Sequence, residues 1–202
     1  MKFPFLASVI LFCLILRILL KRGNKTQEQE LSSFWDRERQ ANATRRKSLD
    51  DLDYITLPLE SFPMQLLTDE EEITDCIRTI QSLSEKKIVN FTGYTNTDLK
   101  LMYGAPNITQ LIQYDQSYTT LARTLQKWAA LLYDRGYVAE ARVLLEFAVS
   151  THTDVSGTYS LLCQIYRAQN EPEKIPELLV TVNTLRSARK DTIVRIVQES
   201  CP

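Results

Sequence analysis

The sequence predicts an all-α fold, in which a single N-terminal transmembrane helix precedes a small solenoid of helical hairpins that ends in a capping helix. Three observations lead to this prediction. An apolar run of about 18 residues begins at Phe3, and apolar residues recur at helical spacing from Ile73 to Leu83. A helical pattern also repeats after 34 residues in the C-terminal half. The chain of 202 residues, 44% of them hydrophobic, is long enough for one domain plus an appendage.

Residues 1–23 are the predicted transmembrane anchor, with its apolar part at residues 3–20. Apart from Ser8 and Arg17 this part is apolar, and about 18 residues are just enough to cross a bilayer. Arg17 lies one turn from the end, where its side chain can reach the headgroups. The alternative is a cleaved signal peptide. No small-residue cleavage site follows the apolar run, so the sequence favours a retained anchor.

Flanking charge predicts the orientation of this anchor. Only Lys2 and the amino terminus precede it, whereas Lys21, Arg22 and Lys25 follow it, and the more basic side stays in the cytoplasm. The sequence therefore predicts a single-pass membrane protein with a cytoplasmic C-terminal domain. The four scattered cysteines agree with a reducing compartment. Four N-x-T sequons point the other way, toward a glycosylated external body; they begin at Asn24, Asn42, Asn90 and Asn107.

Two segments connect the anchor to the folded body. Residues 24–47 are polar and contain no proline, which predicts a stalk helix; in the alternative interpretation, Phe34 and Trp35 dock on a membrane interface or on the body. Residues 48–67 alternate apolar and polar side chains but contain two prolines. Because proline removes a donor from a sheet ladder, we expect an extended strap across a helical surface.

Residues 68–121 are predicted to form a divergent N-terminal helical region. Within 68–85, apolar residues at positions i, i+3, i+4 and i+7 predict an amphipathic helix of about 17 residues. Turn-forming residues predict a loop at 89–106 with a short helix near Asp98–Met102, and a second helix is expected within 107–121. The apolar stripe of the first helix consists of Ile73, Cys76, Ile77, Ile80 and Leu83.

The C-terminal half contains the repeat. When residues 122–155 are aligned with 156–189, large apolar residues meet large apolar residues, and each unit is predicted to be a helix, a turn and a second helix. Gly136 is expected just after the first helix, where a left-handed backbone suits glycine, and Asn170 takes that place in the second unit. Residues 190–202 are predicted to be a capping helix.

A period of 34 residues with this pattern resembles the tetratricopeptide repeat (TPR) family. The second unit lacks the family's Gly and Ala, and the closing Pro is absent after both units. The whole chain is similar to short, N-terminally membrane-anchored TPR-containing proteins of Gram-positive bacteria. The residues that carry the resemblance are Trp128, Ala129, Leu132, Gly136, Ala141, Leu145 and Ala148, and then Tyr159, Leu162, Cys163, Tyr166 and Leu179.

The resemblance implies a membrane-tethered scaffold or adaptor in the cytosol, whose concave groove binds a protein or peptide. The alternatives are a receptor or assembly factor for protein translocation or membrane-complex building, and a homo-oligomeric structural protein with an extracytoplasmic body. Three cations in the groove suit an acidic or polar extended peptide. The groove residues carried over are Arg123, Gln126, Lys127, Tyr133, Gln164 and Arg167, with Ala130 and Ser160 beside them.

Other functions are less well supported by the sequence. A formal net charge of −1 argues against nucleic acid as the partner. No catalytic or phosphate-binding motif is present, and one histidine with four scattered cysteines offers no zinc spacing, so we expect no enzyme activity, cofactor or metal. His152 is expected in a connecting loop, where a single histidine is usually solvated.

Overall fold

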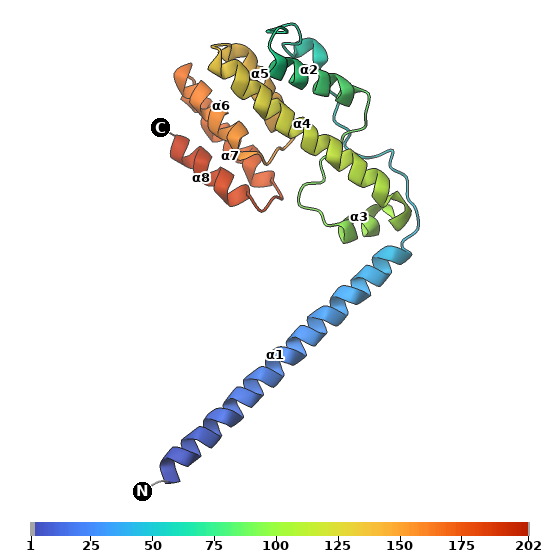
Figure 1. Ribbon diagram of the computed structural model, residues 1–202, viewed down its shortest axis with the longest axis vertical. Coiled ribbons are helices and arrows are strands. Elements are labelled where there is room, and N and C mark those ends of the chain that lie inside the picture. The colour runs from blue at the N-terminus through green and yellow to red at the C-terminus, as the bar shows by residue number, and fades with distance from the viewer. Residues whose placement is uncertain (1–2, 202) are drawn as a thin grey trace. The chain divides into compact units, whose positions relative to one another are not determined.

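The computed structural model describes the backbone of residues 3–201 and the side chains of Ser8 and of residues 11–13, 16–17 and 28–201. Every element in that part of the chain is a helix, which confirms the all-α prediction (Figure 1). Three 3₁₀ turns lie at Leu59–Ser61, Ala105–Asn107 and Pro172–Lys174. The α-helices are α1 (Phe3–Ala43), α2 (Glu71–Ser84), α3 (Asn96–Tyr103), α4 (Ile108–Asp134), α5 (Val138–Ser150), α6 (Ser156–Ala168), α7 (Ile175–Thr184) and α8 (Lys190–Ser200).

The predicted transmembrane anchor is wrong. Among the residues that the structure describes, no helix combines the length and the apolar character that crossing a membrane requires. The apolar run was at the lower length limit and includes Arg17, and α1 continues from it into the polar residues up to Ala43. The predictions that depended on the anchor are corrected with it. These are the single-pass membrane localisation, the cytoplasmic orientation of the C-terminal domain, and the membrane as a partner through residues 3–20.

The chain forms two compact units. The first consists of Met1–Lys47 and Asn96–Pro106, and the second of Ser48–Thr95 and Asn107–Pro202. In the first unit, α1 and α3 bury Ala41 and Leu99, while Phe34 and Trp35 are more than half exposed. Polar contacts join Arg37 to Asp98 at 2.5 Å, Lys100 to Glu38 at 3.3 Å, and Thr97 to Glu38.

The second unit is a stack of helices in which sequence neighbours pack together. α4 packs on α5, α5 on α6, and α8 covers both α6 and α7 (Figure 1). α2 packs against α4, and all five residues of its predicted apolar stripe are buried. The strap crosses this surface and inserts Phe62, whose ring contacts Trp128 and Phe147 edge to face, with ring centroids 6.3 and 5.2 Å away.

Residues at which the repeat was aligned lie in the core of this unit, together with buried residues of α2 and α8. Large side chains fill it, and small ones let the helices approach closely. Fully buried residues include Trp128, Ala129, Leu132, Ala141, Leu145, Ala148, Tyr159 and Leu162.

Helix boundaries differ from the predicted repeat in two places. α4 begins at Ile108, well before residue 122, because no Gly or Pro interrupts residues 108–134 and apolar side chains continue the buried stripe. In the second unit of the repeat, Pro172 starts a 3₁₀ turn and Pro176 occupies the first turn of α7. Proline is tolerated there because the first backbone N–H groups of a helix have no partner within it.

Helices α4, α5 and α6 end in the same way. Each is followed by a residue with positive φ, and the next N–H returns to a carbonyl in the last turn, as in a Schellman motif. The positive φ values are 84° at Gly136, 58° at His152 and 59° at Asn170. The expectations for Gly136 and Asn170 are confirmed. The closing hydrogen bonds are Tyr137 N to Leu132 O (2.9 Å), Thr153 N to Ala148 O (3.4 Å) and Glu171 N to Tyr166 O (2.8 Å).

Candidate functional site

The residues of the predicted groove lie in different surroundings. Arg123 and Lys127 are exposed on α4, and Gln164 is exposed on α6. Gln126 is half-buried where α4 meets the start of α6, and a Cβ on Gly157 would lie 3.1 Å from its Nε2. The remaining two are engaged: Tyr133 packs against the core, and the Arg167 guanidinium donates hydrogen bonds to Ser200 O at 2.9 Å and Glu199 O at 3.2 Å.

A groove between α2 and α4, here called the α2–α4 groove, has a volume of about 710 Å³. One wall is the C-terminal half of α2 together with Lys86 and Lys87, and the other is the N-terminal half of α4. The α4 wall presents side-chain amides and hydroxyls, so the groove offers many hydrogen-bond groups and two positive charges. Its lining residues are Thr79, Ser82, Leu83, Lys86, Lys87, Gln110, Gln113, Tyr114, Gln116, Ser117 and Thr120.

The α4 wall continues beyond the groove along one exposed face of the helix. Gln116, Thr120, Arg123 and Lys127 follow one another at spacings of three and four residues, which places them on the same side of a helix. All four are exposed, and none is acidic. This face therefore connects two residues of the predicted groove to the α2–α4 groove.

The acidic start of α2 contacts the far end of that face. Glu72 lies 3.9 Å from Lys127, and the carboxylate of Glu70 forms an ion pair with Arg135, just after α4. These pairs are partly exposed and contribute little to stability. They nevertheless show that carboxylates can lie against the face of α4 that carries Arg123 and Lys127, here called the basic face of α4.

A second cavity, the His152 cavity, has a volume of about 520 Å³. It lies among the strap, the loop after α2, and the C-terminal ends of α5 and α7. His152 lies in the turn after α5 and is exposed, as expected, and it also lines this cavity, as does Arg186. The sequence gives no signal for this site, because its residues come from four separate segments.

Asn90 closes the end of α5 next to the His152 cavity. Its side-chain amide donates hydrogen bonds to Thr151 O at 2.9 Å and to His152 O at 3.2 Å. A glycan on this nitrogen would disrupt both bonds. Asn107, in another of the four sequons, is only 1% exposed, so two sequons are poor acceptor sites in the folded chain.

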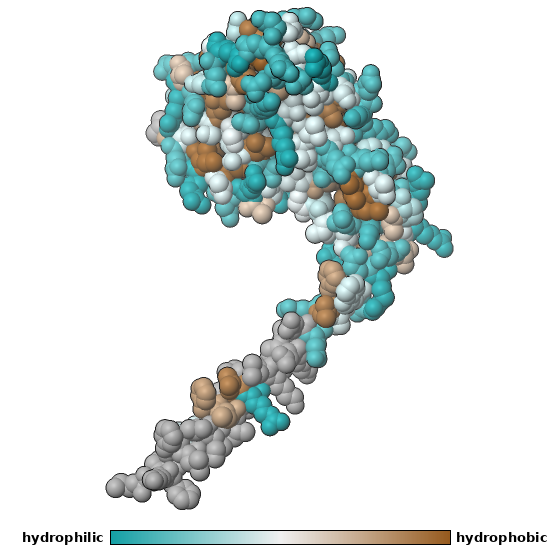
Figure 2. All heavy atoms as spheres, viewed as in Figure 1, coloured by the Kyte–Doolittle hydropathy of each residue, from teal (hydrophilic) through white to brown (hydrophobic). Residues whose placement is uncertain are grey.

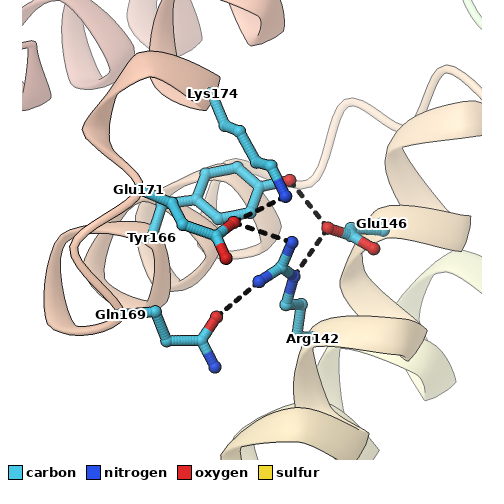
Figure 3. Close-up of polar contacts among 6 residues, drawn as sticks. All are labelled: Arg142, Glu146, Tyr166, Gln169, Glu171 and Lys174. Carbon is cyan, nitrogen blue, oxygen red and sulfur yellow. Dashed lines mark hydrogen bonds and ion pairs between the residues drawn. The ribbon is translucent and has the colours of Figure 1, made fainter.

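A third group of polar residues joins α5 to the turn after α6 (Figure 3). Hydrogen bonds to Glu171 and Glu146 raise the pKa of Arg142, and the same Arg142 contact lowers the pKa of Glu171. Burial raises the pKa of Tyr166, which donates a hydrogen bond to Glu146 at 3.0 Å. Two cations here face two carboxylates, so we interpret this cluster as a structural clamp. The cation distances are Arg142 to Glu146 2.8 Å, Arg142 to Glu171 3.0 Å and Lys174 to Glu171 2.5 Å.

The visible face of the second unit is mostly hydrophilic, with hydrophobic residues in small separate patches (Figure 2). Comparison with protein-family models, curated proteins and solved structures found no match to the chain. The resemblance to the tetratricopeptide repeat therefore rests on the residues of this chain alone, and so does the argument for function.

Proposed function

We propose that this protein is a helical-repeat scaffold of the tetratricopeptide type, which acts by binding an acidic segment of a protein partner and not as an enzyme. The segment lies in the α2–α4 groove and along the basic face of α4. One observation supports this choice above the others. The exposed face of α4 formed by Gln116, Thr120, Arg123 and Lys127 contains two cations and no acidic residue. Glu72 of the same chain contacts this face at Lys127, which shows that a carboxylate can lie there.

The charge distribution around the groove favours an acidic ligand. Lys86 and Lys87 line the groove, and Arg123 extends it, while none of these three forms an ion pair with a carboxylate within the described residues. Lys87 lies over the ring of Tyr54, 4.8 Å from its centroid, which favours this position of its ammonium. Because these cations are exposed, their contribution should be to specificity and to the rate of association.

The length of the site fits a short extended peptide. From Gln113 to Lys127 the helix axis runs about 21 Å, at a rise of roughly 1.5 Å per residue. An extended chain covers that distance in about six residues, at roughly 3.3 Å per residue. The side-chain amides along the α4 wall can bond the peptide backbone, which has no partner of its own in an extended segment.

Fluorescence anisotropy with the full chain tests this proposal. We expect a labelled hexapeptide rich in Asp and Glu to bind, and the same peptide with Gln or Lys at those positions to bind at least about tenfold more weakly. Raised salt should weaken the binding, because exposed charges are screened. Equal binding of the three peptides would contradict the proposal.

Charge variants locate the site. The double variant Lys86→Glu with Lys87→Glu should reduce the affinity for the acidic peptide at least about tenfold. Glu72→Gln should increase it about two- to threefold, since it releases Lys127 from a weak ion pair. The matched control is Arg195→Glu, an exposed cation on α8, which should leave binding unchanged. If the control and the double variant behave alike, the α2–α4 groove is not the site.

A further inference from the structure

The His152 cavity has the size of a site for one small molecule, because such sites usually enclose a few hundred Å³ or more. Its walls combine both kinds of charge with an apolar part. Arg186 supplies a guanidinium, Asp53 supplies a carboxylate, and Ile55, Phe147 and Leu185 supply apolar surface. This site is separate from the α2–α4 groove and shares no lining residue with it.

The hydrogen bonds around His152 indicate which of its ring nitrogens carries the proton. Thr184 Oγ1 lies 2.6 Å from Thr181 O and 3.2 Å from His152 Nδ1. A hydroxyl has one hydrogen, and when Thr184 donates it to the Thr181 carbonyl, the contact favours the tautomer in which Nδ1 of His152 donates to Thr184. In the neutral ring the proton is then on Nδ1, and Nε2 remains as an acceptor.

The guanidinium of Arg186 contacts Tyr94 in two ways. It lies over the Tyr94 ring, 4.7 Å from the centroid, and donates a hydrogen bond to the Tyr94 hydroxyl. Gly93 brings the backbone of this loop close to Arg186, so that a Cβ on Gly93 would lie 2.5 Å from Arg186 O. A guanidinium has five N–H donors in a planar fork, and so retains donors for a carboxylate.

Arg186 favours a negatively charged ligand group, whereas the other polar groups in the cavity wall favour a positively charged one. α5 and α7 both end at the cavity, at Ser150 and Thr184, and the C-terminal end of a helix carries partial negative charge. Asp53 adds a full negative charge, and Nε2 of His152 adds an acceptor. These groups favour a cationic donor such as an ammonium, whereas Arg186 favours a carboxylate.

From these groups we infer that the His152 cavity binds a free α-amino acid as a zwitterion. Its carboxylate contacts Arg186, and its ammonium contacts Asp53 and Nε2 of His152. The side chain of the amino acid packs on Ile55, Phe147 and Leu185. A ligand with only one of the two charges leaves either Arg186 or Asp53 without a partner. The cavity should therefore select ligands that carry both a carboxylate and an ammonium.

Thermal unfolding of the full chain, with each standard amino acid added at about 10 mM, tests the inference, because a ligand that binds only the folded state raises the midpoint. We expect an apolar amino acid such as leucine to raise it. The analogues 4-methylpentanoate, which lacks the ammonium, and 3-methylbutylamine, which lacks the carboxylate, should not. If no amino acid raises the midpoint, or if either analogue matches leucine, the inference is overturned.

Two variants assign the charges, with calorimetric titration of leucine as the measurement. Arg186→Gln and Asp53→Asn should each weaken binding at least about tenfold, the usual effect of losing a charged hydrogen bond. Asp53 lies in the exposed strap, so its variant tests the site even if Arg186→Gln disturbs the loop packing. The matched control is Arg189→Gln, in the same connection between α7 and α8 but outside the lining, and it should bind normally. Unchanged affinity in Asp53→Asn would refute the ammonium site.

Discussion

At the scale of single residues, a comparison of two glycines distinguishes the cost of a left-handed backbone from the cost of a steric clash. Gly136 and Gly93 have nearly equal positive φ values of 84° and 86°. A Cβ at Gly136 meets nothing within 4 Å, whereas a Cβ at Gly93 lies 2.5 Å from Arg186 O. Gly136→Ala should therefore cost only the left-handed strain, about 1 kcal/mol of the free energy of unfolding. Gly93→Ala should cost about 1–3 kcal/mol more, because backbone must move.

Urea denaturation of the two alanine variants measures this difference. Gly136→Ala serves as the control, since it changes the same residue type at the same φ without the contact. Equal losses of stability in the two variants would show that the loop at Gly93 yields freely to the added Cβ.

The residues with positive φ after the helices differ in how well the sequence predicts them. Gly136 and Asn170 were predicted to end helices because both residue types tolerate a left-handed backbone. His152 occupies the equivalent position after α5, but a histidine gives no comparable signal. Its place in a cavity depends on Arg186 and on the strap, which are distant in sequence and meet it only through tertiary packing.

At the scale of helices, the clamp around Arg142 makes the packing of α5 on the turn after α6 depend on pH. The contact with Arg142 lowers the pKa of Glu171 from its ordinary value of 4.5. A lowered pKa in the folded state means that the charged carboxylate stabilises the fold at every pH above 4.5. That stabilisation is lost as the pH falls below 4.5, through the lowered pKa of Glu171.

The free energy of unfolding of wild type and of Glu171→Gln, measured between neutral and acid pH, tests this dependence. The wild type should be the more stable at neutral pH, and the difference should shrink toward zero in acid. Glu173→Gln, an exposed neighbour in the same turn, is the control and should show no such trend. A difference that stays constant with pH would mean that the clamp does not stabilise the charged form of Glu171.

Helix boundaries show the limits of periodicity. The stripe of α2 was predicted in full because burial of one face imposes it. The continuity of α4 was not predicted. The repeat alignment begins at residue 122, whereas the helix extends without a break from Ile108. The α2–α4 groove lies against the N-terminal half of α4, at Gln110, Gln113 and Gln116, where a separate helix was expected within residues 107–121. A repeat pattern therefore located the packing residues but missed the cavity beside them.

At the scale of the whole molecule, the repeat architecture and the two compact units determine how a local loss spreads. Helices that pack on one another share interfaces, so a loss of packing at one helix should spread first to the helices that it contacts. α8 closes the stack by packing on α6 and α7, and its Ile193 and Val197 are fully buried. The first unit has its own buried residues and is compact by itself.

Ile193→Ala should lower the free energy of unfolding by about 2–4 kcal/mol, since it removes buried methyl groups and leaves a cavity. Ile196→Ala, at a half-buried position of the same helix, is the matched control and should cost less. In hydrogen exchange, Ile193→Ala should increase the exchange of α6, α7 and α8 most, while α3 and the C-terminal part of α1 keep their protection. Equal loss of protection in all helices would instead show that the chain opens as one cooperative body, with the first unit tied to the second.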